Sequence, residues 1–398
     1  MSFERVRGFL TKELVDVEKL PRSSPQIIVG IGSETGKILK EQNVKNVKKL
    51  SQQDSKTLNQ LTGIRRSQIE RWISAAKILV AIGKGDVSDR KKIVLAGLDN
   101  AGKTSMIQTL TTGCVPVSLN HHRELIELGP TEGLQREEMS LFGWVQADIY
   151  DLGGLERYRM RYFEEKVEVF SQTDLLIFII DAQDHGRYNA ALDYLDIILE
   201  VYSSLGEIPY TAVFLNKWDA EISESPEYEE RLELLKKSIS KLFRKYRFDR
   251  FHIDNTSVFE AEKLFLSFST ALRKITNAYP VIEGILREYG ELLGSKDLML
   301  FDDKALLIAE YTSNYREILS ATTMRMIWLR ETLTDNYSLN ASTITVELGP
   351  NEIIVCKPTD WEDKTVYLSG VLPSTEKSSV LNILGEELQP WIRNIGII

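Results

Sequence analysis

The sequence predicts an α/β protein in which a parallel-rich sheet wrapped by helices lies between an all-helical N-terminal region and an α+β C-terminal region. Short apolar runs alternate with helical patterns through the middle of the chain, which is typical of parallel strands joined by helices. Short helical patterns precede this part, and alternating strands follow it. At 398 residues, with 43% hydrophobic and 27% charged residues, the chain is long enough for two or three globular domains.

The N-terminal region is helical and basic. Residues 3–18 carry apolar side chains at helical spacing, which predicts an amphipathic helix. Residues 20–82 contain two similar halves, each with an apolar–Gly–apolar turn between short helical patterns; the turns read VGIG at 29–32 and LTGI at 61–64. From Lys19 to Arg90 there are 14 Lys and Arg against 6 Asp and Glu, although the chain as a whole has a net charge of −9.

These two halves resemble a tandem helix-hairpin-helix domain. In that family, the hairpin glycines present backbone N–H groups to a DNA phosphate, and the modules also dock proteins. The resemblance therefore implies contact with DNA or with protein, and both remain open. The basic side chains fit a nucleic-acid backbone, but they also fit a solvated face. The Gly-, Ser- and Asp-rich residues 83–90 predict a linker.

A phosphate-binding loop opens the central region. A buried strand at 93–96 is followed by Gly97-x-x-x-x-Gly102-Lys103-Thr104. Glycines let backbone N–H groups surround phosphate oxygens, Lys103 can reach the terminal phosphates, and the Thr104 hydroxyl can ligate Mg²⁺. The helix expected to begin near Gly102 directs its positive end at the same phosphates. The predicted nucleotide contacts are Asp99, Asn100, Ala101, Gly102, Lys103, Thr104 and Ser105.

Four further motifs follow in order, with an irregular loop predicted at 114–129 before the first of them. They are Pro130-Thr131-x-Gly133, Asp151-Leu152-Gly153-Gly154 after a strand at 147–150, Asn216-Lys217-x-Asp219 after a strand at 212–215, and Thr256-Ser257-Val258 after a strand at 251–253. Another buried strand, 175–180, ends in Asp181, and helical patterns occupy 188–205 and 229–246. Because loops at the carboxyl ends of parallel strands share one sheet edge, these motifs should form one site.

In this order the motifs resemble the Ras-type GTPase set. The phosphate loop, the Thr131 segment and Asp-x-Gly-Gly are similar to the Arf branch, whereas KTSM at 103–106 and YF at 162–163 are similar to Rag/Gtr proteins. The resemblance covers roughly residues 91–275. It implies a GTPase that acts as a GTP/GDP-dependent switch through effectors and GTPase-activating proteins.

The resemblance also implies how the base is recognised. Asp219 would accept hydrogen bonds from the guanine N1–H and N2–H₂, which adenine cannot supply. Asn216 and Lys217 would brace the base and the phosphate loop. Ser257 and Val258 would border the base, with the Val258 amide facing the guanine O6.

The same resemblance assigns the metal and the catalytic candidates. Thr104 and Thr131 would ligate Mg²⁺ directly, and Asp151 would hold it through water. Thr131 and the Gly154 amide would contact the γ-phosphate, so that two loops become ordered with GTP and are released after hydrolysis. The candidates for catalysis are Lys103, Thr131 and Gly154.

One position departs from the family. The water-positioning glutamine follows the second glycine of Asp-x-Gly-Gly, and this chain has Leu155 there. Leucine can neither orient a water molecule nor share transition-state charge, so we expect unassisted hydrolysis at about 10⁻⁴ s⁻¹ or below. Two alternatives stay open: a nucleotide-bound scaffold without turnover, and a DNA-associated P-loop NTPase.

The last third of the chain predicts a separate α+β domain. Its predicted elements are helices at 282–293, 315–333 and 378–388, the last stopped by Pro390, and strands at 298–301, 305–310, 343–348, 352–357 and 365–370. This order resembles the roadblock/longin-like domain of Rag/Gtr proteins, which implies a homo- or heterodimer. We therefore expect domains at 1–82, 91–278 and 279–398, with a linker at 83–90.

Composition excludes several classes. The two cysteines have no paired-ligand spacing, so neither a disulfide framework nor a zinc site is expected. No apolar run approaches the ~20 residues that cross a bilayer. The sequence begins without a secretory signal pattern, so we expect a cytoplasmic protein, with recruitment to a membrane surface by partners left open.

Overall fold

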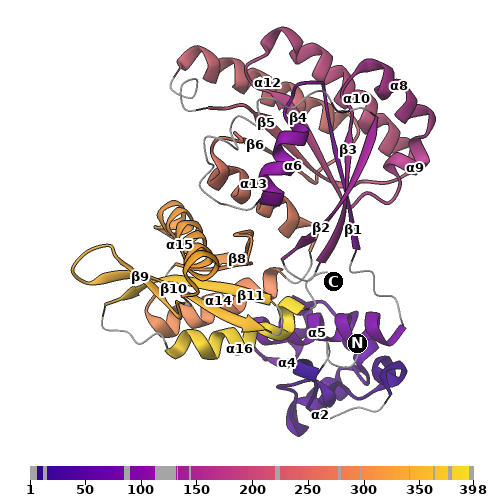
Figure 1. The fold of residues 1–398 in the computed structure, drawn as a ribbon. Coiled ribbons are helices and arrows are strands. Elements are labelled where there is room, and N and C mark those ends of the chain that lie inside the picture. The colour runs from indigo at the N-terminus through magenta and orange to yellow at the C-terminus, as the bar shows by residue number, and fades with distance from the viewer. Residues whose placement is uncertain are drawn as a thin grey trace.

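The computed structural model confirms the predicted fold class. It describes residues 7–11, 16–84, 90–112, 131, 133–142, 145–219, 225–276, 279–295, 297–339, 341–361, 364–374 and 379–393. Figure 1 shows a central α/β unit above two smaller units that lie side by side, one formed by the N-terminal helices and one by the C-terminal sheet and its helices. The irregular loop predicted at 114–129 lies outside the described residues.

The central sheet has six strands in the order β2-β3-β1-β4-β5-β6. Only β2 and β3 pair antiparallel; the other neighbours are parallel. The strands are β1 (Arg90–Gly97), β2 (Leu134–Leu141), β3 (Val145–Leu152), β4 (Leu175–Asp181), β5 (Tyr210–Asn216) and β6 (Phe251–Asn255). The carboxyl ends of β1, β3, β4, β5 and β6 therefore meet at one edge, as the sequence predicts.

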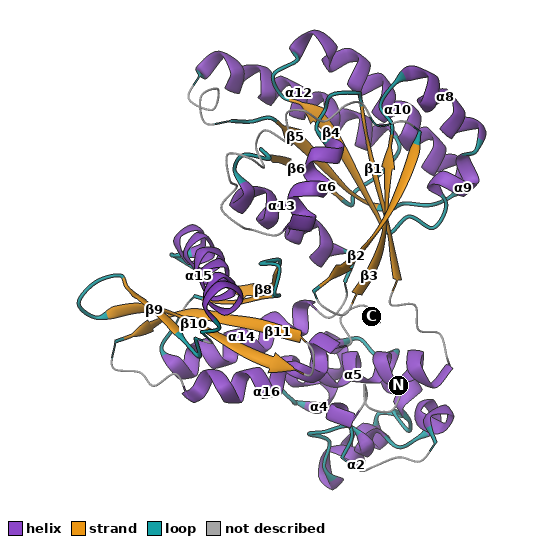
Figure 2. Cartoon of the chain, in the orientation of Figure 1, coloured by secondary structure: helices purple, strands orange, loops and turns teal. Residues whose placement is uncertain are grey.

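Helices cover both faces of this sheet (Figure 2). On β1, Ile93 and Leu95 pack into one apolar cluster and Val94 and Ala96 into the other, because successive strand side chains point to opposite faces. The first cluster includes side chains of α6 (Lys103–Thr112) and α13 (Ala261–Lys274). The second includes α8 (Glu156–Glu164), α9 (Lys166–Phe170), α10 (Tyr188–Leu205) and α12 (Pro226–Lys245).

The N-terminal unit contains two glycine turns. Its elements are the 3₁₀ helices η1 (Arg7–Phe9), η2 (Val17–Arg22) and η3 (Pro25–Ile27), and the α-helices α2 (Ser33–Glu41), α3 (Val47–Ser51), α4 (Ser55–Thr62) and α5 (Arg66–Lys84). Gly30 lies between η3 and α2, and Gly63 lies between α4 and α5. Both have left-handed φ angles, 86° and 69°, which a glycine adopts without steric cost.

The amphipathic helix predicted over 3–18 was wrong for the described part of that segment. Arg7–Phe9 forms a single 3₁₀ turn, and Leu10 then forms a β-bridge with Ile28. The turn is held by tertiary contacts, since the Phe9 ring packs edge-on against Trp391 with centroids 4.8 Å apart. The segment between α5 and β1 is shorter than the linker predicted at 83–90, because α5 extends through Lys84 and β1 begins at Arg90. Residues 85–89 lie outside the described part.

The C-terminal unit is an antiparallel sheet with helices. Its elements are α14 (Tyr279–Leu293), β7 (Leu298–Phe301), β8 (Leu307–Tyr311), α15 (Arg316–Tyr337), β9 (Ile344–Glu347), β10 (Glu352–Trp361), β11 (Lys364–Pro373) and α16 (Ser379–Arg393). The strand order is β8-β7-β11-β10-β9. Contrary to the prediction, Pro390 lies inside α16 rather than ending it. Packing holds the last turn, because the Pro390 ring lies against Gly8 and the neighbouring Trp391 against Phe9.

The N-terminal and C-terminal units, which are far apart in sequence, are joined by an ionic contact. The Arg71 guanidinium on α5 lies 2.6 Å from the Glu288 carboxylate on α14 and 2.7 Å from the Glu387 carboxylate on α16. The Tyr289 hydroxyl donates to the same Glu387 side chain at 2.6 Å. The N-terminal unit therefore covers the α14 and α16 side of the C-terminal unit.

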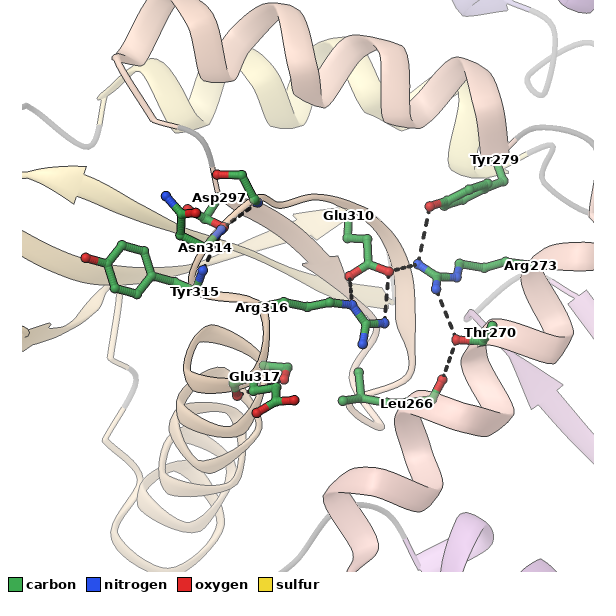
Figure 3. A network of polar contacts seen from close by, with 12 residues as sticks. Leu266, Thr270, Arg273, Tyr279, Asp297, Glu310, Asn314, Tyr315, Arg316 and Glu317 are labelled. Atoms are coloured by element: carbon green, nitrogen blue, oxygen red, sulfur yellow. Dashed lines mark hydrogen bonds and ion pairs between the residues drawn. The ribbon is translucent and has the colours of Figure 1, made fainter. Parts of the chain in front are cut away.

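A second contact joins the central unit to the C-terminal unit (Figure 3). The Glu310 carboxylate on β8 accepts hydrogen bonds from Arg273 on α13, at 2.9 Å, and from Arg316 at the start of α15, at 2.7 and 3.0 Å. Nearby, the buried Ser269 hydroxyl on α13 accepts the Leu307 N–H at 2.9 Å. None of the helices in the described ranges is long and apolar enough to span a membrane.

Candidate nucleotide-binding site

The phosphate loop connects β1 to α6 through residues with positive φ angles. Gly97, Asn100 and Gly102 have φ angles of 152°, 61° and 92°, values that favour glycine and that asparagine tolerates. A Cβ atom at Gly102 would lie 2.3 Å from the Asn216 amide nitrogen. The loop therefore needs glycine at this position both for its backbone conformation and for its contact with the neighbouring strand end.

Lys103 is buried in this loop, with 5% of its surface exposed. Its ammonium group donates to the backbone carbonyls of Gly97, at 3.1 Å, and Leu98, at 2.8 Å. Burial lowers the pKa of Lys103 to about 8, against the opposing charges of Asp151 and Asp99. An anionic phosphate close to this buried ammonium would stabilise its charged form.

Three oxygen-bearing side chains converge beside the loop. The Thr104 hydroxyl lies 2.5 Å from the Thr131 hydroxyl and donates to Asp151 at 2.7 Å. The second Asp151 carboxylate oxygen is buried and has no hydrogen-bond partner within the described parts of the chain. Hydroxyl and carboxylate oxygens suit a hard cation such as Mg²⁺, so this donor set fits the ion that the sequence predicts. Burial raises the pKa of Asp151, which the Thr104 hydrogen bond and the Lys103 charge oppose.

The Asp-x-Gly-Gly segment lies directly against the phosphate loop. The Gly153 N–H donates to the Gly133 carbonyl at 2.9 Å and to the Tyr162 hydroxyl at 3.0 Å. A Cβ atom at Gly154 would lie 2.1 Å from the Asp99 backbone nitrogen, so any side chain there would force the two loops apart. Leu155 follows as the half-buried first residue before α8.

The residues predicted to recognise the base lie at the carboxyl ends of β5 and β6. The buried Asn216 side chain donates to the Ala101 carbonyl at 2.9 Å and so connects β5 to the phosphate loop. The Ser257 hydroxyl donates to one carboxylate oxygen of Asp219. Val258 is buried beside them. The structure therefore places all the predicted nucleotide and metal residues, from Asp99–Ser105 through Val258, at one edge of the sheet.

The Gtr1/RagA G protein conserved region matches residues 92–327 of this chain. The chain belongs to the Gtr1/RagA G-protein family. The match extends beyond the central unit, through β7 and β8 and to just past the middle of α15.

Individual relatives match a smaller part of this chain than the family region does. ADP-ribosylation factor-like protein 3 from Caenorhabditis elegans is 28% identical over 139 residues, which are 34% of this chain and 65% of the relative. Small COPII coat GTPase SAR1 from Nicotiana tabacum is 28% identical over 127 residues, 32% of this chain and 55% of the relative. ADP-ribosylation factor-like protein 3 from Chlamydomonas reinhardtii is 31% identical over 128 residues, which are 32% of this chain and 63% of the relative. The chain thus spans between 55% and 65% of the length of these relatives.

Among solved structures, the Arl6 BBS3 small GTPase from Trypanosoma brucei with the bound nucleotide analogue GppNp is similar at 22% identity with a TM-score of 0.36. That match covers 47% of this chain and 97% of the other.

Sequence reasoning missed three residues of this Gtr1/RagA-family site. They lie at the end of β4 and in the segment that follows it, between the loops that it did identify. Asp181 pairs with the Lys217 ammonium at 2.8 Å, Gln183 donates to Asp219 at 3.0 Å, and Arg187 pairs with Asp99 at 2.6 Å. The strand order could have indicated these residues. Because β4 lies between β1 and β5, the loop that follows β4 must border the phosphate loop after β1 and the motif after β5.

Proposed function

We propose that this Gtr1/RagA-family protein is a GTP/GDP-dependent switch with slow GTP hydrolysis. The observation that carries the proposal is the Asp219 carboxylate, which Ser257 contacts at the same sheet edge as the phosphate loop. A carboxylate accepts the two N–H donors of guanine, whereas adenine offers an acceptor at N1. The family membership favours this reading over a DNA-associated ATPase.

The phosphate end uses the buried Lys103 and the amides of the loop around Gly102. Thr104, Thr131 and Asp151 are the residues that would hold Mg²⁺, which offsets phosphate charge when bound. Thr131 and the Gly154 amide are the groups that would respond to the γ-phosphate, since both border the phosphate loop. In the diphosphate state they would lose that contact, which supplies the two states of a switch.

Competition between GTP and ATP tests the nucleotide proposal directly. Isothermal titration calorimetry with Mg²⁺ present should give GTP affinity at least about a hundredfold above ATP affinity, because two hydrogen bonds to a charged acceptor separate the bases. Equal affinities would remove the basis for the switch. Turnover measured with and without cell extract then separates a partner-stimulated GTPase from a scaffold that never hydrolyses.

Substitution of Leu155 by glutamine should accelerate single-turnover GTP hydrolysis by about tenfold or more, because an amide can hold the attacking water that leucine cannot. The rate of phosphate release from pre-loaded GTP measures this effect. Leu155→Met is the matched control and should leave the rate unchanged, since it conserves an apolar side chain. An unchanged rate in Leu155→Gln would show that water positioning is not what limits hydrolysis.

We also propose the division into domains at 1–82, 91–278 and 279–398 and dimerisation through the last of these. Two features support an interface on the side away from the N-terminal unit. Helix α15 exposes Ile318 and Leu329, and β9 is an edge strand with an exposed Val346. An unpaired edge can add a strand from a second chain. Light scattering of the purified protein, alone and with a related chain, distinguishes monomer, homodimer and heterodimer.

The N-terminal unit is a second candidate binding module. The lysines of α2 and α3 and of the turn between them are exposed: Lys37, Lys40, Lys45, Lys48 and Lys49. The turn glycines Gly30 and Gly63 are exposed as well. This surface supports phosphate-backbone contact of the helix-hairpin-helix kind, with protein docking as the alternative. Duplex DNA binding that weakens steeply with salt would support the first, and a pull-down with GTP- and GDP-loaded protein would identify protein partners.

A further inference from the structure

We propose that Gln183 is a specificity-determining positioning residue, which fixes the Asp219 carboxylate for guanine. The inference rests on the proposed guanine-nucleotide function. Gln183 lies in the loop between β4 and α10, outside the five sequence motifs. Its side-chain nitrogen donates to the Asp219 carboxylate at 3.0 Å and to the Lys217 carbonyl at 2.9 Å.

The orientation of the Gln183 amide is decided by its partners. Both are oxygens that can only accept, a backbone carbonyl and a carboxylate. The NH₂ end must therefore face them, and its two hydrogens are both used. The Gln183 backbone is held too, because its N–H donates to the Asp181 carboxylate at 2.9 Å. Asp181 in turn pairs with the Lys217 ammonium at 2.8 Å.

The hydrogen bond from Gln183 leaves the Asp219 carboxylate with enough acceptor positions to bind guanine. A carboxylate offers about four lone-pair positions over two oxygens. At Asp219, Ser257 uses one on the first oxygen and Gln183 uses one on the second. One position is left on each oxygen, which matches the pair of donors, N1–H and N2–H₂, on the edge of guanine. The two protein donors thus hold the carboxylate plane while leaving it able to accept both base hydrogens.

Holding both oxygens matters more for guanine than for a base with a single donor. If Gln183 no longer held the second oxygen, the Asp219 side chain could rotate, and simultaneous acceptance of two hydrogen bonds would be lost first. Hypoxanthine lacks the 2-amino group and needs only one acceptor. The prediction is therefore a change in the ratio of GDP to IDP affinity, beyond any general loss of binding.

The test substitutes Gln183 by methionine, which keeps the length of the side chain and removes its donors. Competition of GDP, IDP and ADP against a fluorescent guanine nucleotide gives the three affinities with Mg²⁺ present. Wild type should prefer GDP to IDP, and Gln183→Met should reduce that preference by about five- to tenfold, as expected for a lost hydrogen bond to a charged group. Asn189→Leu is the matched control, an exposed amide at the start of α10.

The outcomes separate this inference from the function on which it rests. A lower GDP-to-IDP ratio in Gln183→Met, with the ratio intact in Asn189→Leu, supports the positioning role. A selective wild type with an unchanged ratio in Gln183→Met overturns the inference alone. Equal loss for GDP and IDP also overturns it, because a loosened fold weakens both. A wild type that binds ADP as well as GDP overturns the proposed function and the inference together.

Discussion

Asp219→Asn should lower GDP affinity by about a hundredfold or more while leaving the weak ADP affinity unchanged. The asparagine amide keeps the size of the side chain but replaces one acceptor oxygen with a donor, which faces the guanine donors instead of accepting from them. Two hydrogen bonds to a charged group are weakened together, and each contributes about 1.5–3 kcal/mol. Calorimetric titration of both nucleotides measures the difference.

Asp193→Asn is the control for this substitution. Asp193 is exposed on α10, so the loss of its charge should change GDP affinity by less than about twofold. If Asp219→Asn bound GDP as tightly as wild type, the carboxylate would not be the group that selects the base. The proposal that this chain is a guanine-nucleotide switch would then fail.

The parts of the site that the sequence predicted are those whose geometry is local. Asn216 ends β5, and the motif around Asp219 follows it directly, so a short pattern after an apolar run is enough to place it. The same holds for Asp151 at the end of β3 and for Lys103 at the start of α6. Parallel pairing then brings these loops to one edge, because every parallel strand ends there.

The missed residues act across long sequence distances. Gln183 and Asp219 are 36 residues apart, and Arg187 and Asp99 are 88 apart, and neither pair forms a recognisable local pattern. The same reason explains the errors at the chain ends. Helical spacing at residues 3–18 and a proline near the end of α16 are local signals, and the contact between Phe9 and Trp391 overrides both.

The sequence did not predict the contact between the central and C-terminal units. This contact contributes to the stability of the fold. Arg273 is the last residue but one of α13, which begins three residues after Val258 of the base-recognition loop. Its side chain is only 6% exposed and pairs with Glu310, whose side chain is 12% exposed. Arg316 completes the group from α15 (Figure 3). Burial of the Arg273 charge is energetically acceptable only while the Glu310 carboxylate is ionised and pairs with it.

Glu310→Gln should therefore lower the free energy of unfolding by about 3 kcal/mol at pH 7, because it leaves the Arg273 charge buried without a counter-charge. Glu283→Gln is the matched control, since Glu283 forms a more exposed pair with Arg287 one turn along α14, and its loss should cost less than about 1 kcal/mol. Urea unfolding of the full chain, followed by tryptophan fluorescence, compares the variants by their midpoints.

The pH dependence of this difference distinguishes a charge effect from a packing effect. Burial by itself would raise the pKa of Glu310, but hydrogen bonds and charges from Arg316 and Arg273 outweigh it and lower the pKa below its ordinary value. A carboxylate with a lowered pKa stabilises the folded state at neutral pH, and this contribution is lost as the pH falls through the lowered value. The difference in free energy of unfolding between wild type and Glu310→Gln should thus be constant near neutral pH and become smaller below about pH 4. If this difference stayed constant down to pH 3, the destabilisation of Glu310→Gln would come from packing rather than from charge.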